Sequence, residues 1–130
     1  MSDNFSKVKG YLNELKYSIV DENEAEGMII IDNEDEGIKN MVIVIEDPIL
    51  IMQQSIFRVK SDDMNMYKSL LQKNQDILHG AFVLNEAGDG VLFRDTLQVE
   101  NLDLNELAGS LNSLSLLLGE YANEIIKFSA

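Results

Sequence analysis

The 130-residue sequence contains no cysteine and only one histidine, His79. The absence of cysteine excludes disulfides, thiolate zinc sites and cysteine nucleophiles. A single histidine cannot build a histidine metal cluster, and a Ser-His-Asp set would need this one residue as its base. Because His79 stands before Gly80 at the predicted end of a helix, we expect it to interact with the helix dipole rather than to act in catalysis.

Positively charged residues are scarce. The chain has 10 Lys and Arg against 23 Asp and Glu, which gives a net charge of -13. Nucleic acid binding needs clustered cations, and an anionic membrane surface would repel so acidic a chain, so we expect neither as a partner. The acidity either serves solubility or attracts a basic protein, and charge alone leaves both interpretations open.

Long apolar runs are also missing. No segment approaches the run of about 20 apolar residues that a membrane span requires. The first residues, Met1–Phe5, lack the basic start and apolar core of a signal peptide. We therefore expect a soluble, cytoplasmic protein, and its length is typical of a single domain covering residues 1–130.

No motif indicates catalysis or a cofactor. The acidic turn Asp32–Gly37 resembles a calcium loop, but the twelfth position is Ile43 instead of glutamate, so only loose binding of a divalent ion remains as an alternative. Gly88-x-Gly90 lacks the third glycine of a dinucleotide site and lies in a hairpin. Nothing singles out a pair of carboxylates. We predict no catalytic residue, no cofactor, no metal site and no enzymatic activity.

The strongest pattern lies at the C-terminal end, residues 103–128. Apolar residues alternate at spacings of three and four, which places them on one helical face. Asp103 and Glu106 can form a capping box, with Leu102 and Leu107 as a hydrophobic staple. The pattern predicts one continuous core helix about 39 Å long, enough to cross the whole domain. The predicted stripe is Leu104, Leu107, Leu111, Leu114, Leu118, Tyr121, Ile125 and Phe128.

The opposite face of this helix carries small, uncharged residues. Gly109, Asn112, Leu116 and Gly119 fall there, although the protein is rich in carboxylates. Two glycines inside a helix each cost about 1 kcal/mol relative to alanine. They permit close approach of another backbone, and Leu116 adds an apolar contact. This face is either an ordinary solvated surface or a site of self-association, and we take these four residues as the candidate homodimer interface.

The rest of the chain predicts an α+β fold. A first helix carries Phe5, Val8, Leu12 and Leu15 at helical spacing, and the run Ser61-Asp62-Asp63 offers a cap for a second helix. Short connections between the apolar segments favour an antiparallel sheet. The order is helix, strands, helix, hairpin, helix, with three helices in all. Strands are expected at 17–20, 27–31, 41–45, 49–59, 81–84 and 91–94, and the second helix is expected to end near His79 with Met64, Tyr67, Leu71 and Leu78 inward.

Three of these strands are apolar on both faces, namely 28–31, 41–45 and 49–52. A half-solvated antiparallel strand would alternate instead. Either helices cover both faces of the sheet, or something outside this chain covers one of them. Leu50, Met52 and Ile56 share one parity of the fourth strand and are the candidate contacts for a partner protein.

A family resemblance rests on residues 71–94. Leu71-x-x-Asn74, Gly80-x-Phe82-x-Leu84 and Gly88-x-Gly90-Val91-x-Phe93-Arg94 resemble the most typical stretch of YbjN-type domains. The order of elements is similar to that of these domains and of the type III secretion chaperones that share their fold. The resemblance implies a small, acidic, non-enzymatic homodimer, and in the secretion chaperones such a fold holds an extended segment of a partner against apolar surface.

Two functional hypotheses follow. The first is a chaperone-like or regulatory protein-binding module that covers an apolar segment of a partner, with carboxylates attracting a basic one. The second is a regulatory domain that binds a small ligand between helix and sheet. A long groove or open patch would favour the first, and an enclosed apolar pocket with convergent polar groups would favour the second.

Overall fold

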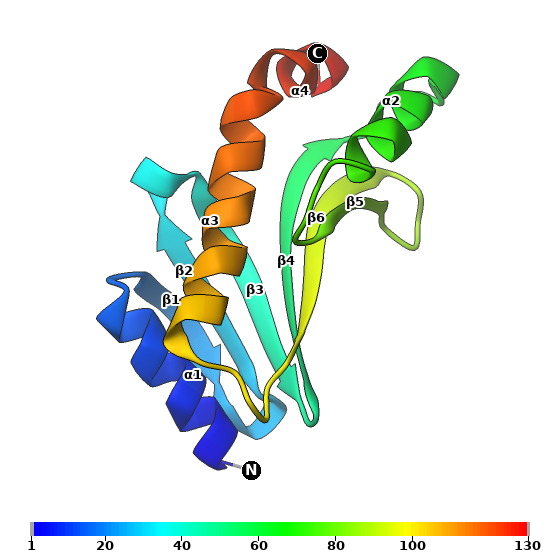
Figure 1. The fold of residues 1–130 in the computed structure, drawn as a ribbon. Helices are drawn as coiled ribbons and strands as arrows, with labels where there is room; N and C mark the ends of the chain where they lie inside the picture. The colour runs from blue at the N-terminus through cyan, green and yellow to red at the C-terminus, as the bar shows by residue number, and fades with distance from the viewer. Residues whose placement is uncertain (1, 130) are drawn as a thin grey trace.

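The computed structural model describes residues 2–129, and its ribbon is drawn in Figure 1. Ten main elements follow one another, with single 3-10 turns, η1 and η2, between the first strands. Their bounds are α1 (Ser2–Glu14), β1 (Ser18–Asn23), η1 (Glu24–Glu26), β2 (Met28–Asn33), η2 (Glu34–Glu36), β3 (Ile38–Glu46), β4 (Ile49–Arg58), α2 (Met64–Asn74), β5 (Ala81–Leu84), β6 (Gly90–Gln98), α3 (Leu104–Glu120) and α4 (Ala122–Ser129).

The six strands form one antiparallel sheet in the order β1-β2-β3-β4-β6-β5. The first four strands are a meander, and the β5–β6 hairpin then places β6 beside β4, so that β5 becomes the second edge. The predicted α+β class, antiparallel sheet and element order are confirmed. The described residues contain four α-helices instead of the expected three, because the last helix is broken.

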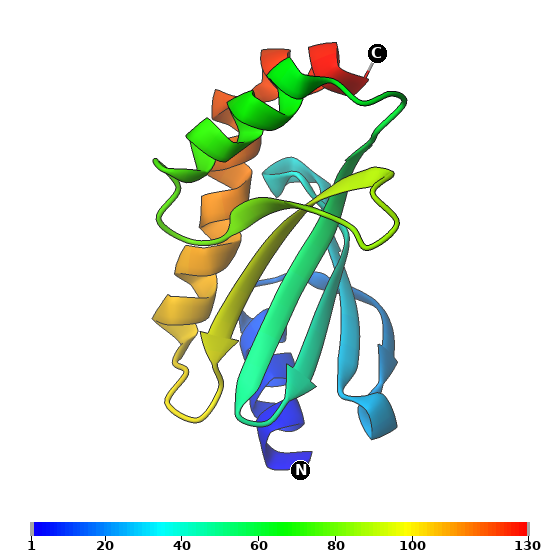
Figure 2. The same ribbon diagram turned by 90° about the vertical axis from the view of Figure 1, so that its right-hand side faces the viewer.

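The core lies between the sheet and the helices on one of its faces. Figures 1 and 2 show α1 and α3 lying across the same side of the sheet, with α2 and α4 near its upper end. Alternate strand residues point into this layer, where Ile29, Ile43 and Met52 are cross-strand neighbours with no exposed surface. The helices contribute a matching set of buried residues: Phe5, Val8, Leu12, Leu107, Leu111 and Leu114.

The long C-terminal helix starts as predicted but does not continue. Asp103 caps α3 by accepting a hydrogen bond from the Glu106 N–H at 2.7 Å. The helix then breaks at Tyr121, whose ψ is 16°, so the prediction of one continuous helix was wrong. The break turns α4 toward the end of β4, where Phe128 lies 6.2 Å from Phe57 between ring centroids. The apolar spacing continues through the break and therefore could not reveal it.

The second helix is shorter than predicted and buries another face. Its N-cap is Asp63, within the predicted capping run 61–63, but α2 ends at Asn74, five residues before His79, so His79 does not cap it. The buried residues of α2 are Met66 and Leu70. Three residues that we expected to point inward are exposed instead: Met64, Leu71 and Leu78, with 69%, 69% and 92% of their surface accessible.

Candidate protein-binding surfaces

One face of the sheet is left uncovered by the described residues. In Figure 2 the strands pass in front of α1, α3 lies to their left, and no α-helix lies in front of β2, β3 and β4. Five half-buried apolar residues form what we call the open-face patch: Met28, Ile30, Val42, Val44 and Ile51. They alternate with the core positions and are joined by the pairs Ile30–Val42, Met28–Val44 and Val44–Ile51. Of the two alternatives, cover of both faces by helices therefore does not hold for residues 2–129.

The patch has a polar border and a hollow. Toward β6 the cross-strand neighbours become Arg94 and Thr96, both exposed. A hollow of about 350 Å³ beside the patch is lined by Lys39, Asn40, Val42, Gln53, Ser55 and Leu92. An extended segment lying on this face would thus meet apolar surface over β2–β4 and polar groups over β6.

The residues predicted to touch a partner are not on this face. Leu50 and Met52 have no exposed surface because they point into the helix layer. A β-bulge between Ser55 and Phe57 shifts the register, so Phe57 is buried in place of Ile56, which is only half-buried. The alternation along β4 holds as far as Gln54 and correctly placed Leu50 and Met52 on one face of the sheet. It could not show that the helices pack against that same face.

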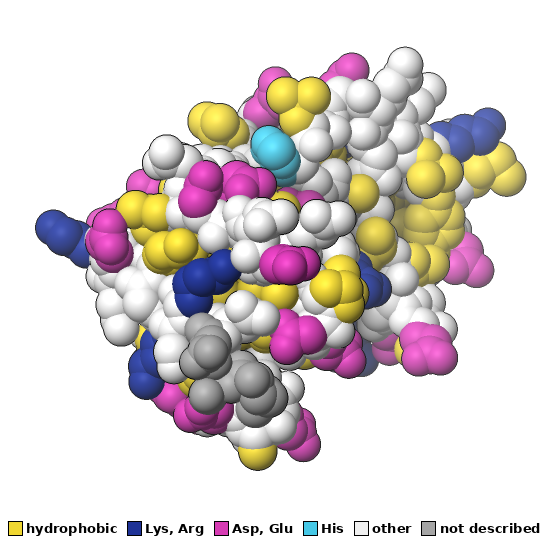
Figure 3. All heavy atoms as spheres, turned by 60° about the horizontal axis from the view of Figure 1, so that its bottom comes forward, with side chains coloured by type: hydrophobic (Ala, Val, Ile, Leu, Met, Phe, Trp, Pro, Cys, Tyr) yellow, Lys and Arg dark blue, Asp and Glu magenta, His cyan; other side chains and the backbone are white. Residues whose placement is uncertain are grey.

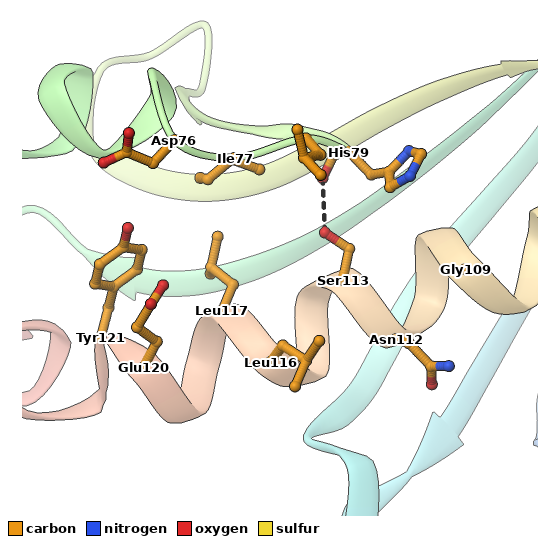
Figure 4. Close-up of a pocket in the computed structure, with 11 residues that line it drawn as sticks. Asp76, Ile77, His79, Gly109, Asn112, Ser113, Leu116, Leu117, Glu120 and Tyr121 are labelled. Atoms are coloured by element: carbon orange, nitrogen blue, oxygen red, sulfur yellow. Dashed lines mark hydrogen bonds between the residues drawn. The ribbon is translucent and has the colours of Figure 1, made fainter.

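A second surface is the groove between α3 and the loop of residues 75–80. It encloses about 460 Å³, and Figure 4 shows the side chains that line it. Leu117, which is 4% exposed, lies beneath it, while Leu116 on α3 and Leu78 on the loop are 74% and 92% exposed. The Ser113 hydroxyl donates a 3.1 Å hydrogen bond to the His79 carbonyl and ties the loop to the helix (Figure 4).

One end of this groove is acidic. Asp76 and Glu120 line it beside Tyr121. Desolvation raises the pKa of the Tyr121 hydroxyl, and the negative charges of Glu120 and Asp76 raise it further. Lys73 lies 5.1 Å from the centre of the Tyr121 ring, but its ammonium is paired with Glu124. Lys and Arg do not occur among the residues that line the groove.

The candidate dimer residues lie along this groove. Gly109, Asn112 and Leu116 line it, and Gly119 is exposed on the same helix without lining the groove. A Cβ added to Gly109 or Gly119 would meet nothing within 4 Å, apart from the helix's own nearby backbone and chain neighbours. The structure therefore places all four residues on an open surface. Leu78 completes this surface, and the sequence pattern missed it by assigning it to the second helix.

A third, smaller hollow lies between α2 and the β5–β6 hairpin. It encloses about 210 Å³ and is almost entirely apolar. Small-molecule sites are usually about 300–1,000 Å³ and offer convergent polar groups. Here the Tyr67 hydroxyl already donates to Asp62 at 3.0 Å and the Asn74 amide is bonded to Phe82. Exposed Leu71 and half-exposed Leu84 border this hollow.

Acidic side chains outnumber basic ones in this chain, 23 to 10. On the face shown in Figure 3, acidic side chains are widely spread, basic ones are few, and hydrophobic side chains are exposed near the single histidine. Among the described residues, no three His, Asp or Glu side chains come together in a way that could hold a metal ion. Within the same residues, no helix is both long and apolar enough to cross a membrane.

Comparison with known families identifies the chain's relatives. The sequence matches the family CesT_Tir_1 over residues 1–130. The chain belongs to the CesT_Tir_1 family. Curated proteins offer no significant match. The resemblance to YbjN-type domains and to the type III secretion chaperone fold is confirmed by this match and by solved structures.

Three solved structures show the same fold at low sequence identity. YbjN from E. coli has 15% identity and a TM-score of 0.69, over 92% of this chain and 91% of that one. The type III secretion chaperone SycH of Yersinia pestis, in complex with a stable fragment of YscM2, has 18% identity and a TM-score of 0.62, over 97% and 99%. The HopA1–SchA chaperone–effector complex has 11% identity and a TM-score of 0.66, over 92% and 95%.

In this CesT_Tir_1 chain, the residues that carried the resemblance have structural roles. Asn74 holds the main chain of Phe82, and Gly80 lies against the Phe93 ring, where a Cβ would be 2.3 Å from Cζ. Asn85 closes the following hairpin by accepting from the N–H groups of Asp89 and Gly90 at 2.9 and 3.1 Å. The pattern thus marks how α2 joins the sheet. Of its residues, Leu71 and Leu84 border the third hollow, whereas the open-face patch lies elsewhere.

Proposed function

We infer that this protein is a non-enzymatic, chaperone-like or regulatory module of the cytoplasm that holds an extended apolar segment of another protein. Membership of the CesT_Tir_1 family supports this function. Structures of similar fold add support, since they are a chaperone–effector complex, the ExsC–ExsE complex and SycH bound to a fragment of YscM2. The observation that carries the proposal for this chain is the uncovered sheet face.

The partner segment lies on the open-face patch. Burial of apolar surface contributes about 25 cal/mol per Å², and the patch presents adjoining apolar side chains on three neighbouring strands. An extended segment can follow such a row of side chains, whereas the row itself does not enclose a small molecule. The net charge of -13 favours a basic segment, because long-range attraction accelerates association with a partner of opposite charge.

The test starts by identifying the segment. A photo-crosslinking amino acid placed at Ile51 marks what lies on the patch inside cells, and mass spectrometry then gives the crosslinked sequence. That segment is synthesised, and its Kd is measured by calorimetry for the wild type and for Val42→Thr/Val44→Thr. Threonine keeps the shape and strand preference of valine but has a hydroxyl in place of one methyl group. We expect the double variant to bind at least tenfold more weakly.

The control is Val83→Thr, the same substitution at a half-buried valine of β5 outside the patch. It should leave the Kd unchanged. Equal binding by the wild type and the double variant would refute the open-face site. A Kd that does not rise with salt would refute the basic character of the segment, since screening weakens attraction between exposed charges.

The proposed functional unit is a homodimer formed through the outer face of α3. Gly109, Asn112, Leu116 and Gly119 are exposed there, and a chain of such negative charge can approach its own copy more easily where carboxylates are absent. Dimerisation on this helix leaves the open-face patch free, because α3 lies on the opposite side of the sheet (Figures 1 and 2).

A further inference from the structure

We propose that the segment held on the open-face patch carries an acidic residue, whose carboxylate binds at the hollow beside the patch, next to Arg94 and Lys39. A basic residue of the same segment, about six positions away, lies over Asp21 on β1. The inference rests on the proposed function, because it needs a segment on the open face. It deepens that function by giving the segment a charge pattern and a direction.

One row of cross-strand neighbours gives the path of the segment. Asp21 of β1 is opposite Ile30 of β2, and the register continues from Ile30 to Val42 of β3. Val42 is opposite Gln53 of β4, which in turn is opposite Arg94 of β6. Residues directly opposite each other lie on the same face of a sheet. The row therefore has a carboxylate at one end, two residues of the open-face patch next to it, and a guanidinium at the other end.

The acidic end of this row faces the uncovered side of the sheet. The next residue along β1, Glu22, points to the helix layer, where its carboxylate pairs with Lys9 of α1 at 3.0 Å. Successive side chains of a strand point to opposite faces, so Asp21 lies on the open face, and it is exposed. A Lys or Arg of the segment therefore meets a carboxylate over β1.

The other end of the row is cationic. Arg94 is exposed and opposite Gln53, which lines the hollow of about 350 Å³ together with exposed Lys39. The side chains that line this hollow include amide and hydroxyl donors but no carboxylate. The carboxylate of Asp32 accepts the Asn40 N–H at 2.6 Å, and it is separated from β6 by β3 and β4.

Arg94 and Lys39 are available to an acidic group from outside. The ion pairs found among the described residues involve neither of them. A guanidinium can donate two parallel hydrogen bonds to one carboxylate, and such charged hydrogen bonds are stronger than neutral ones. The β6 end of the row therefore selects an Asp or Glu of the segment.

The distance between the two ends sets the spacing in the segment. In the order of the sheet β1 is the first strand and β6 the fifth, so they lie about 19 Å apart at about 4.8 Å per strand. An extended segment rises about 3.3 Å per residue, so about six residues cover this distance, and every second side chain faces the sheet. The predicted pattern is a basic residue, two apolar residues at alternate positions over β2–β4, and then an acidic residue.

The opposite charges at the two ends also fix the direction of the segment. The net charge of -13 attracts basic residues over long distances, whereas a carboxylate is attracted only where a cation lies close by. A segment bound in the reverse direction would bring like charges together at both ends of the row. Such repulsion discriminates against the wrong orientation more than attraction strengthens the right one.

The first experiment uses a phage-displayed library of random peptides about 12 residues long, roughly twice the predicted span, as the probe. Sequences that bind the wild type but not Val42→Thr/Val44→Thr are those that use the open face. We expect them to contain an acidic residue about six positions from a basic one. Selection on Arg94→Glu should yield Lys or Arg in place of the acidic residue. An unchanged acidic preference on that variant would overturn the proposal, as would open-face sequences without enrichment of Asp or Glu.

The second experiment measures the contact itself with one selected peptide, synthesised with a fluorescent label. Replacing its acidic residue by the corresponding amide should raise the Kd about three- to tenfold, and Arg94→Gln should do the same. Lys39→Gln should have a smaller effect, since an ammonium does not form the paired hydrogen bonds of a guanidinium. The peptide change and Arg94→Gln together should weaken binding no more than either alone, because both remove the same contact. Additive losses would contradict the proposed pairing.

The matched control is Arg58→Gln. Arg58 is the second arginine of the chain and is also exposed, but the register places it opposite Gly90. That position is four residues along β6 from Arg94, or about 13 Å. Arg58→Gln should leave the Kd of the selected peptide unchanged, and a loss equal to that of Arg94→Gln would show that only net charge matters and would refute the site.

Failure of this inference can be told apart from failure of the proposed function. If the selected sequences depend on Val42 and Val44 but not on Arg94, the open-face site stands and the charge pattern is wrong. If no sequence distinguishes the wild type from Val42→Thr/Val44→Thr, the open-face site itself is refuted, and the charge pattern with it.

Discussion

The side-chain amide of Asn74 pairs with the main chain of Phe82 in the way that a neighbouring strand would. Its Nδ2 donates to the Phe82 carbonyl at 3.1 Å, and its Oδ1 accepts from the Phe82 N–H at 2.8 Å. Because β5 is an edge strand, these main-chain groups would otherwise be unpaired on the free side. The contact joins the end of α2 to the sheet and so helps to position the loop that forms one wall of the groove.

Replacing Asn74 should therefore destabilise the fold. Asn74→Ala leaves a donor and an acceptor of buried Phe82 without their partners, and we expect the free energy of unfolding to fall by about 1–3 kcal/mol. Urea unfolding monitored by circular dichroism measures the change. Asn13→Ala, an exposed residue of α1, is the control and should change stability by less than about 0.5 kcal/mol. Equal losses in the two variants would contradict the role given to Asn74.

Gly80 and Gly88 offer a matched pair of substitutions. Both have positive φ, 87° and 80°, so alanine is strained at either position. A Cβ on Gly88 meets nothing within 4 Å, whereas one on Gly80 would be 2.3 Å from Cζ of Phe93, which is completely buried. We expect losses of about 1 kcal/mol for Gly88→Ala and about 2–4 kcal/mol for Gly80→Ala, since overpacking adds to the backbone strain.

The same urea experiment compares the two glycine variants. Phe93→Leu in the Gly80→Ala background tests the cause directly, because a smaller side chain relieves the clash. The double variant should then lose less stability than the sum of the two single variants. Simple additivity would mean that the Phe93 ring is not what makes alanine unfavourable at position 80.

Replacing Ser110 by alanine should stabilise the fold. Its side chain is 1% exposed on the inner face of α3, and its hydroxyl has no hydrogen-bond partner among the described residues. Ser110→Ala removes a desolvated polar group and improves helix propensity, so the free energy of unfolding should rise by about 0.5–1.5 kcal/mol. Ser113→Ala is the comparison, because its hydroxyl is bonded to the His79 carbonyl and its removal should bring no such gain. A loss of stability in Ser110→Ala would contradict this prediction.

Stability at high pH should depend on Tyr17. Burial raises the pKa of its hydroxyl above the ordinary 10.0, and the charge of Glu36 raises it further. The folded state therefore holds this proton more tightly than the unfolded chain. The resulting stabilisation is fully present below the unfolded pKa and is lost as pH rises through the folded pKa.

The measurement is the urea midpoint of the wild type and of Tyr17→Phe at about pH 8 and about pH 11. Phenylalanine keeps the buried ring but has no proton to lose. We expect the wild type to lose more stability than the variant over this interval, while the difference between them is constant below about pH 9. Parallel losses in the two proteins would show that Tyr17 does not titrate differently on folding.

Local sequence patterns correctly predicted the helices and turns that depend on neighbouring residues alone. The apolar spacing of Phe5, Val8 and Leu12 predicted α1, and all three are buried. The Asp103 cap is where the sequence placed it, and the Asp63 cap lies within the predicted run 61–63, because capping depends only on the following turn. The glycine-containing hairpin was recognised in the same way. The contact between Phe57 and Phe128 joins segments that are far apart in the sequence. The local apolar spacing could not predict such a contact, so the separate helix α4 was missed.

The sequence by itself determined the α+β class, the order of the elements, the acidic surface and the family, since these follow from composition, periodicity and motif residues along the chain. Only the tertiary structure decided which face of the sheet is covered. Ile29 and Ile30 are equally apolar, and their burial differs because the helices pack on one side, a choice made by the whole core at once. Leu50 and Met52 thereby became core, and the open-face patch became the candidate binding surface.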